Sequence, residues 1–88
     1  MPTLKQFRYL VAVADTLHFR RAAEQCHVTQ PTLSAQLREL EERLSVQLVE
    51  RSRSGVVMTP VGDRIVSLAR LVLKDVDSIV EIAKHGKY

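Results

Sequence analysis

The last third of the chain carries one continuous helical pattern. Thr59 supplies a side-chain oxygen that can cap a helix, and Pro60 follows in the first turn, where its missing N–H costs nothing. A helix from Pro60 to about Lys84 would be on the order of 35 to 40 Å long at 1.5 Å per residue, longer than the body of so small a domain. Apolar residues recur along it at spacings of three and four: Val61, Ile65, Leu68, Val72, Val76, Ile79 and Ala83.

This apolar stripe is wider than three short helices could cover. A second row runs beside the first and consists of Ala69, Leu73, Val76 and Val80. Part of the surface must be buried by something else, and a second copy of the chain is the simplest partner. The alternative is a helix that folds wholly onto its own domain. We therefore predict a homodimer through six residues of the first row: Val61, Ile65, Leu68, Val72, Val76 and Ile79.

Three shorter helices are predicted before this long one. The first has the apolar residues Leu4, Phe7, Val11 and Ala14, and the second, about two turns long, has Phe19, Ala22, Ala23 and Cys26. The third starts near Gln30, because Thr29 can cap it and Pro31 lies in its first turn. Its inward row is Leu33, Leu37, Leu40 and Leu44.

The third helix has an unusual order of charges. Its first turn carries no charged residue, whereas Glu39, Glu41 and Glu42 crowd its end. The helix dipole favours the opposite order, since negative side chains stabilise an N-terminus. A helix that inserts its first turn into the DNA major groove would explain the pattern, because short polar groups can approach base edges there and carboxylates would meet phosphate repulsion.

A short hairpin follows the third helix. In VQLVERSRSGVVMTP the apolar residues Val46, Leu48, Val56 and Val57 surround a polar tip at residues 52–55. We expect Arg51 and Arg53 to lie at the tip of this hairpin. The fold class predicted is therefore mainly α-helical: a winged helix-turn-helix domain over residues 1–58, with three helices and a two-stranded wing, followed by a long linker helix over residues 59–88.

The composition is compatible with the predicted fold but does not by itself identify the function. The net charge of +3 and the pI near 9.4 make an acidic partner plausible. No apolar run reaches the roughly 20 residues of a membrane helix, and residues 1–13 lack the features of a secretory signal, so we expect a cytoplasmic protein without a membrane partner. The single cysteine, Cys26, rules out an internal disulfide.

The run FRRAAEQCHVTQPTLSAQLRELEERLSVQLVER, followed by SGVVMTPVGDRI, resembles the N-terminal domain of LysR-type transcriptional regulators. The resemblance covers essentially the whole chain and implies a winged domain followed by a linker helix that pairs antiparallel with its twin. It also implies a C-terminal sensing domain in full-length members, which these residues do not include. Within the family, the helix-turn-helix run is most similar to the peroxide-responsive regulators of the OxyR type.

The resemblance also implies roles for individual residues. It puts Gln30, Pro31 and Thr32 at base edges, Thr29 and Ser34 near phosphates or at the helix cap, and Arg51 and Arg53 in the wing beside the backbone and minor groove. Gln30 is the strongest candidate for base reading, since an amide can bond a base edge bidentately. Arg38 and Arg20 are further candidates for DNA contact. The implied partner is an interrupted inverted repeat of double-stranded DNA, bound by a homodimer, or by a tetramer in the full-length protein.

Four residues depart from the family pattern. Ala35 stands where many members have a basic residue, Ser45 where a glycine commonly ends the third helix, Val49 where Phe is frequent, and His18 where a serine often caps the second helix. A left-handed cap at Ser45 would cost more than one at glycine. His18 and Val49 leave the cap of the second helix and the local packing open.

The sequence offers little support for two other classes of function, an enzyme and a protein-association module. Cys26 and His27 are neighbours that would point about 100° apart on a helix, and no acid or oxyanion loop accompanies them, so we expect no catalytic site, metal or cofactor. Cys26 is expected to be a small buried hydrophobe, and His18 and His85 solvated or capping residues. The competing function is a winged-helix module used only for protein association.

Overall fold

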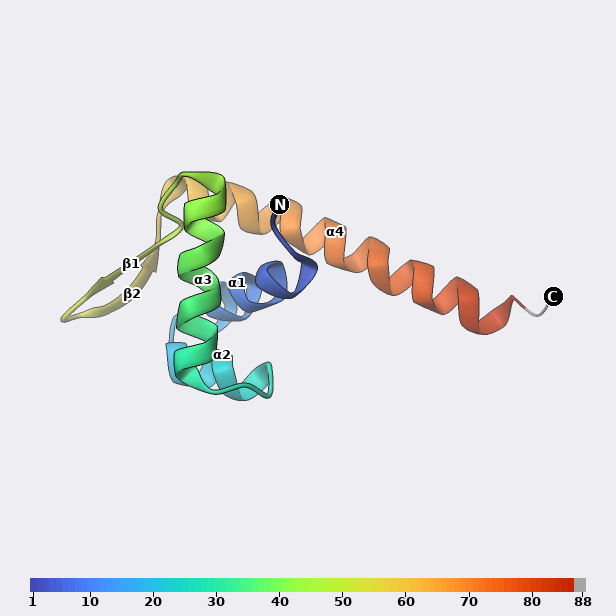
Figure 1. Ribbon diagram of the computed structural model, residues 1–88, viewed down its shortest axis with the longest axis horizontal. Coiled ribbons are helices and arrows are strands. Elements are labelled where there is room, and N and C mark those ends of the chain that lie inside the picture. The colour runs from blue at the N-terminus through green and yellow to red at the C-terminus, as the bar shows by residue number, and fades with distance from the viewer. Residues whose placement is uncertain (87–88) are drawn as a thin grey trace.

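The structure, a computed structural model, describes residues 1–86. Four helices and one two-stranded antiparallel sheet follow one another along the chain. Figure 1 shows the hairpin projecting from one side of the helical body, while the last helix leaves on the other side. The predicted fold class is confirmed. The elements are α1 (Leu4–Thr16), α2 (Phe19–Gln25), α3 (Gln30–Leu44), β1 (Val49–Ser52), β2 (Gly55–Met58) and α4 (Pro60–His85).

Side-chain caps fix where the helices begin. The Thr29 and Thr59 side chains accept from backbone N–H groups at the starts of α3 and α4, and each helix has a proline in its first turn, as predicted. His18 takes the serine's place at α2, because its Nδ1 accepts from the Arg21 N–H at 3.2 Å. Ser45 ends α3 with φ 57°, so the left-handed cap is present without a glycine.

The core lies where α1, α2 and α3 meet. Its largest fully buried apolar side chains are Leu10, Val13, Leu33, Leu40 and Leu48. The alanines Ala22 and Ala23 are buried as well, so α2 can approach its neighbours closely. Each buried leucine removed from water contributes on the order of 2 kcal/mol. This packing fixes α3 rigidly against the rest of the body.

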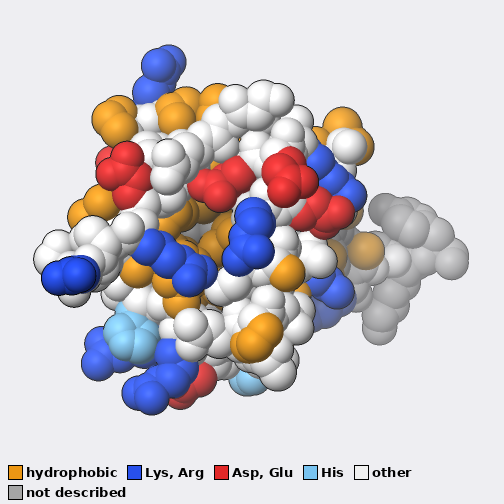
Figure 2. Space-filling view, turned by 60° about the vertical axis from the view of Figure 1, so that its left-hand side comes forward, with side chains coloured by type: hydrophobic (Ala, Val, Ile, Leu, Met, Phe, Trp, Pro, Cys, Tyr) orange, Lys and Arg blue, Asp and Glu red, His pale blue; other side chains and the backbone are white. Residues whose placement is uncertain are grey.

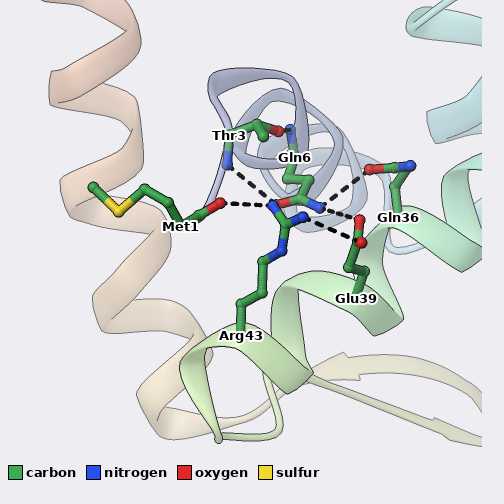
Figure 3. Close-up of polar contacts among 6 residues, drawn as sticks. All are labelled: Met1, Thr3, Gln6, Gln36, Glu39 and Arg43. Atoms are coloured by element: carbon green, nitrogen blue, oxygen red, sulfur yellow. Dashed lines mark hydrogen bonds and ion pairs between the residues drawn. The ribbon is translucent and has the colours of Figure 1, made fainter.

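One fully buried amide connects α1 to α3. The Gln6 Nε2 donates to Gln36 Oε1 at 3.1 Å and to Glu39 Oε2 at 2.8 Å, and its Oε1 accepts from the Thr3 N–H (Figure 3). Arg43 then bonds Glu39 at 3.2 Å and the Met1 carbonyl at 2.6 Å. All hydrogen-bonding atoms of the Gln6 side chain are therefore used, which makes its burial tolerable.

The wing is a tight hairpin. Register runs from Val49 opposite Met58 to Ser52 opposite Gly55, so Arg53 and Ser54 form the two-residue turn. The predicted hairpin is confirmed, but its turn is shorter than the predicted tip, because residues 52 and 55 are already paired in the strands. Arg51, however, lies within β1 and not at the tip, which corrects the sequence interpretation that grouped it with Arg53.

The start of α4 is locked to the root of the wing. The Thr59 Oγ1 donates to the Gln47 carbonyl at 2.7 Å, and the Thr59 N–H donates to the Leu48 carbonyl at 3.0 Å. A Cβ at Gly62 would overlap that same Leu48 carbonyl oxygen. Glycine is therefore required at position 62 for this close approach of helix and chain.

The rest of α4 divides into two halves. Val66, Ala69 and Leu73 are buried against the body. Ala69 and Leu73, from the second apolar row, therefore pack within the same chain and not against a second copy. Two exposed ion pairs also join α4 to α1: Arg70–Asp15 at 2.6 Å and Arg8–Asp77 at 3.8 Å. From residue 74 to residue 85 the helix is exposed apart from the half-buried Val76. The longest dimension of the described chain is 54 Å, which reflects this extension.

Candidate nucleic-acid interface

The first turn of α3 is exposed and uncharged. Gln30, Pro31 and Thr32 are all exposed, and the turn contains no acidic residue. Thr29 Oγ1 accepts from the Thr32 N–H at 3.3 Å and bonds Thr32 Oγ1 at 2.9 Å, which holds both hydroxyls at the cap. The Gln30 side chain is exposed, so its amide is accessible to a ligand.

The wing arginines lie in different surroundings. Arg53 is exposed at the turn of the hairpin. Arg51 lies over the body: its Cζ is 3.7 Å from the centre of the Phe19 ring, and its Nη2 donates to Ser34 Oγ at 2.8 Å. Ser34 is half-buried on α3, and its hydroxyl accepts this hydrogen bond from Arg51. Two residues predicted separately for phosphate contact, Ser34 and Arg51, are thus one hydrogen-bonded pair.

The other two arginines predicted to contact DNA differ in their interactions within the protein. Arg38 is exposed on α3 and lines the groove between that helix and β1. Arg20 lies 3.7 Å from Glu24 in an exposed (i, i+4) pair on α2, which is the intramolecular use of such an arginine. An exposed pair of this kind contributes little to stability and can exchange partners at small cost.

Charges separate on the face that carries the wing. In Figure 2, Asp and Glu side chains form a band along the upper part of this face, and Lys and Arg side chains lie across the middle and lower part; a basic side chain also stands at the upper edge and an acidic one lies low among the basic ones. The upper part corresponds to the C-terminal end of α3, where Glu39, Glu41 and Glu42 are placed (Figure 1). An anion approaching this face therefore meets favourable potential at the N-terminal half of α3 and at the wing.

Two of these acids have structural roles that the sequence interpretation missed. Glu41 Oε2 accepts the backbone N–H of Leu48 at 2.7 Å and that of Val49 at 3.2 Å, and so fixes the chain where it enters the wing. Glu39 belongs to the network around Gln6. No local pattern signals either contact, because the partners are seven or more residues away.

Cys26, the C-cap residue of α2, lies at the edge of the core. Cys26 is half-buried and packs against the core, so the expected burial is only partial. Burial raises the pKa of the Cys26 thiol, and the positive charge of Arg8 offsets part of this rise. In the part of the chain that the structure describes, no group of three or more His, Cys, Asp or Glu side chains could hold a metal ion. Nor is any helix within residues 1–86 long and apolar enough to cross a bilayer.

The outer face of α4 is apolar and exposed. Leu68 and Ile79 are 64% and 65% exposed, Val72 is 42% and Val61 36%, while Ile65 and Val76 are half-buried. Beside them an apolar hollow of about 180 Å³ is lined by Phe7, Leu44, Ile65, Leu68, Ala69 and Val72. Of the six predicted dimerisation residues, the described part of the chain therefore covers Ile65 and Val76 in part and leaves the other four exposed.

A three-helix body, a recognition helix that follows α2 after a short turn, and a hairpin wing define a winged helix-turn-helix domain of the DNA-binding class. Residues 4–63 match the family of bacterial regulatory helix-turn-helix proteins named for lysR, so the chain belongs to that family.

Relatives with known names cover nearly all of this chain. It is 49% identical over 82 residues to the DNA-binding transcriptional dual regulator OxyR of Escherichia coli K12, a match that spans 93% of this chain and 27% of the relative. A full-length OxyR variant from Pseudomonas aeruginosa is 50% identical with a TM-score of 0.93, covering 98% of this chain and 29% of that one. The chain thus spans about a quarter of the length of these relatives.

A complex of the BenM DNA-binding domain with catB site 1 DNA gives a further comparison. It is 38% identical to this chain, with a TM-score of 0.90, and the match covers 94% of this chain and 93% of that one. The similarity therefore extends over the winged domain and the long helix together.

Proposed function

We propose that this chain is the DNA-reading part of a bacterial transcription regulator. In this proposal a homodimer binds an interrupted inverted repeat of double-stranded DNA, α3 lies in the major groove, and the wing contacts the backbone and minor groove. The full-length protein would form a dimer or a tetramer and act in the bacterial cytoplasm, associated with the nucleoid. The BenM complex with DNA supports the proposal, since that domain matches this chain over nearly its whole length.

The observation that carries the proposal is the exposed first turn of α3. Gln30, Pro31 and Thr32 present an amide, a ring and a hydroxyl without a carboxylate beside them. An amide can bond both the N6 and N7 positions of adenine, and small groups can contact the methyl group of thymine. We therefore assign base reading to these three residues, with Gln30 as the main determinant.

The other residues supply phosphate contacts in this proposal. Thr29 lies at the cap, Arg38 on the exposed face of α3, Arg51 in the groove beside the wing and Arg53 at its turn. Ser34 contributes through Arg51, to which it is hydrogen-bonded. The role of Arg20 is the weakest, because its guanidinium already pairs with Glu24.

The second copy of the chain would cover the outer face of α4. The six residues assigned to the interface are apolar and at least partly exposed, and they flank an apolar hollow: Val61, Ile65, Leu68, Val72, Val76 and Ile79. Burial of this apolar surface between two copies would stabilise the dimer by a free energy of about 25 cal/mol for each Å² removed from water. Pairing two α4 helices would also set the distance between the two recognition helices.

The competing function is a winged-helix module for protein association alone. The exposed arginines at residues 38 and 53 and the uncharged first turn of α3 argue against it. Fluorescence anisotropy titrations of a labelled random duplex at several salt concentrations separate the two functions. We expect log K to fall linearly with log salt, because bound cations displace condensed counterions.

A matched pair of variants makes this test specific. Arg53→Gln should weaken binding and shallow the salt slope by about one, whereas Lys84→Gln, which removes the same charge near the end of α4, should change neither. Absence of binding at low salt would support protein association instead. Equal changes in affinity and salt slope for the two variants would show that the wing does not contact the DNA.

A further inference from the structure

A groove separates α3 from β1 on the face assigned to DNA. It has a volume of about 380 Å³, and its lining includes Phe19 from α2, Ser34, Arg38 and Glu41 from α3, and Arg51 from β1. The groove therefore joins α2, the recognition helix α3 and the wing at one place.

The guanidinium of Arg51 is held from two directions in this groove. Its Cζ lies over the Phe19 ring, 3.7 Å from the ring centre, and its Nη2 donates to Ser34 Oγ at 2.8 Å. Phe19 is only 9% exposed and packs in the core, so the ring is a fixed support. A guanidinium has five N–H donors in a planar fork, and Ser34 uses one of them. The other donors remain available for an anion.

We propose that Phe19 is a positioning residue which, with Ser34, holds Arg51 so that the remaining N–H groups of its guanidinium are presented to a DNA phosphate. This inference rests on the proposed function. Its physical basis is preorganisation: an arginine already held in its bound rotamer loses less conformational entropy when it binds a phosphate. Arg53 provides the contrast, since the same side chain lies exposed at the turn of the hairpin.

The carboxylate of Glu41, which lines the same groove, already accepts two backbone hydrogen bonds. Glu41 directs one carboxylate oxygen to the Leu48 and Val49 N–H groups, and Arg51 bonds Ser34. The negative charge of Glu41 disfavours a phosphate deep in the groove. The outer edge, between Arg38 and Arg51, is therefore the position at which a backbone phosphate fits.

A double-mutant cycle on a labelled random-sequence duplex at low salt tests the inference. Phe19→Leu removes the aromatic face and keeps an apolar side chain in the core. An exposed cation–π contact predicts a loss of affinity of about two- to fivefold for each bound subunit. If Phe19 acts through Arg51, this loss disappears when Phe19→Leu is made in the Arg51→Ala background. A loss of the same size in that background would overturn the inference, since Phe19 would then act only through the fold.

Two further variants keep the test decisive if Phe19→Leu is too unstable to assay. Phe19→Tyr retains an aromatic face and should bind DNA as the parent chain does. Arg51→Lys keeps the charge but loses the planar guanidinium and its fork of donors, and should bind DNA less tightly than the parent chain but more tightly than Arg51→Ala. Full affinity in Arg51→Lys would show that charge alone suffices and would end the positioning role.

The outcomes separate this inference from the proposed function. Failure of the parent chain to bind any duplex would overturn the proposed function, and the inference with it. Binding that is weakened by Arg51→Ala, together with an additive cycle, would overturn the inference alone.

Discussion

The carboxylate of Glu41 controls how the wing is attached to the recognition helix. It lies in the last turns of α3, and its Oε2 accepts the N–H groups of Leu48 and Val49, the residues that lead into β1. Leu48 is fully buried in the parent chain, so removal of the acceptor leaves its N–H without this hydrogen bond at the base of the groove. We therefore predict that Glu41→Ala destabilises the domain and loosens the wing.

The magnitude follows from the two hydrogen bonds. A bond to a charged acceptor contributes about 1.5 to 3 kcal/mol, and the half-buried position of Glu41 favours the lower end of this range. The bond at 3.2 Å is weaker than the bond at 2.7 Å. We expect Glu41→Ala to lower the free energy of unfolding by about 2 to 3 kcal/mol in total. Glu41→Gln keeps a neutral acceptor and should lose about half as much, since charge-assisted bonds are about twice as strong.

Urea unfolding followed by circular dichroism measures these differences at one fixed protein concentration. Glu42→Ala is the matched control, because Glu42 is the next residue of the same helix and is exposed. Its substitution should change the free energy of unfolding by less than about 0.5 kcal/mol. A Glu41→Ala variant as stable as the parent, or a Glu42→Ala variant equally destabilised, would refute the reasoning.

Three further predictions concern recognition, assembly and packing. Gln30→Ala should relax discrimination at one base position by about 1 to 3 kcal/mol, whereas Arg53→Ala should weaken binding to all duplexes; equal losses on selected and random DNA for both variants would remove Gln30 from base reading. Val72→Asp should yield monomers and weaker DNA binding, and an unchanged sedimentation coefficient would exclude the α4 interface. Gly62→Ala should cost about 1 to 3 kcal/mol because its Cβ meets the Leu48 carbonyl, and an unaltered urea midpoint would contradict this.

The helix boundaries were predictable because their signals are local. Thr29 with Pro31, and Thr59 with Pro60, each combine a side-chain cap with a proline in the first turn. The helices begin at the predicted residues for this reason. The length of α4 was equally accessible, since its apolar spacing continues without a break for more than six turns.

Contacts between distant residues were not predictable in the same way. The stack of Arg51 on Phe19 joins positions 32 residues apart, and no periodicity links them. The sequence pattern also could not show which apolar residues of α4 face the body. Ala69 and Leu73 have the same apolar character as the exposed row and differ only in packing against the same chain. At His18 the sequence left the cap open, and geometry supplied an imidazole nitrogen in place of a hydroxyl.

Selection of bound fragments from a pool of random duplexes tests the central proposal most directly. Two copies joined through α4 should enrich two half-sites related by two-fold symmetry and separated by whole turns of the double helix, about 34 to 36 Å each. Enrichment of such an interrupted inverted repeat is the predicted result. A pool that stays random, or one that converges on a single unpaired half-site, would contradict the assembly of two recognition helices on DNA.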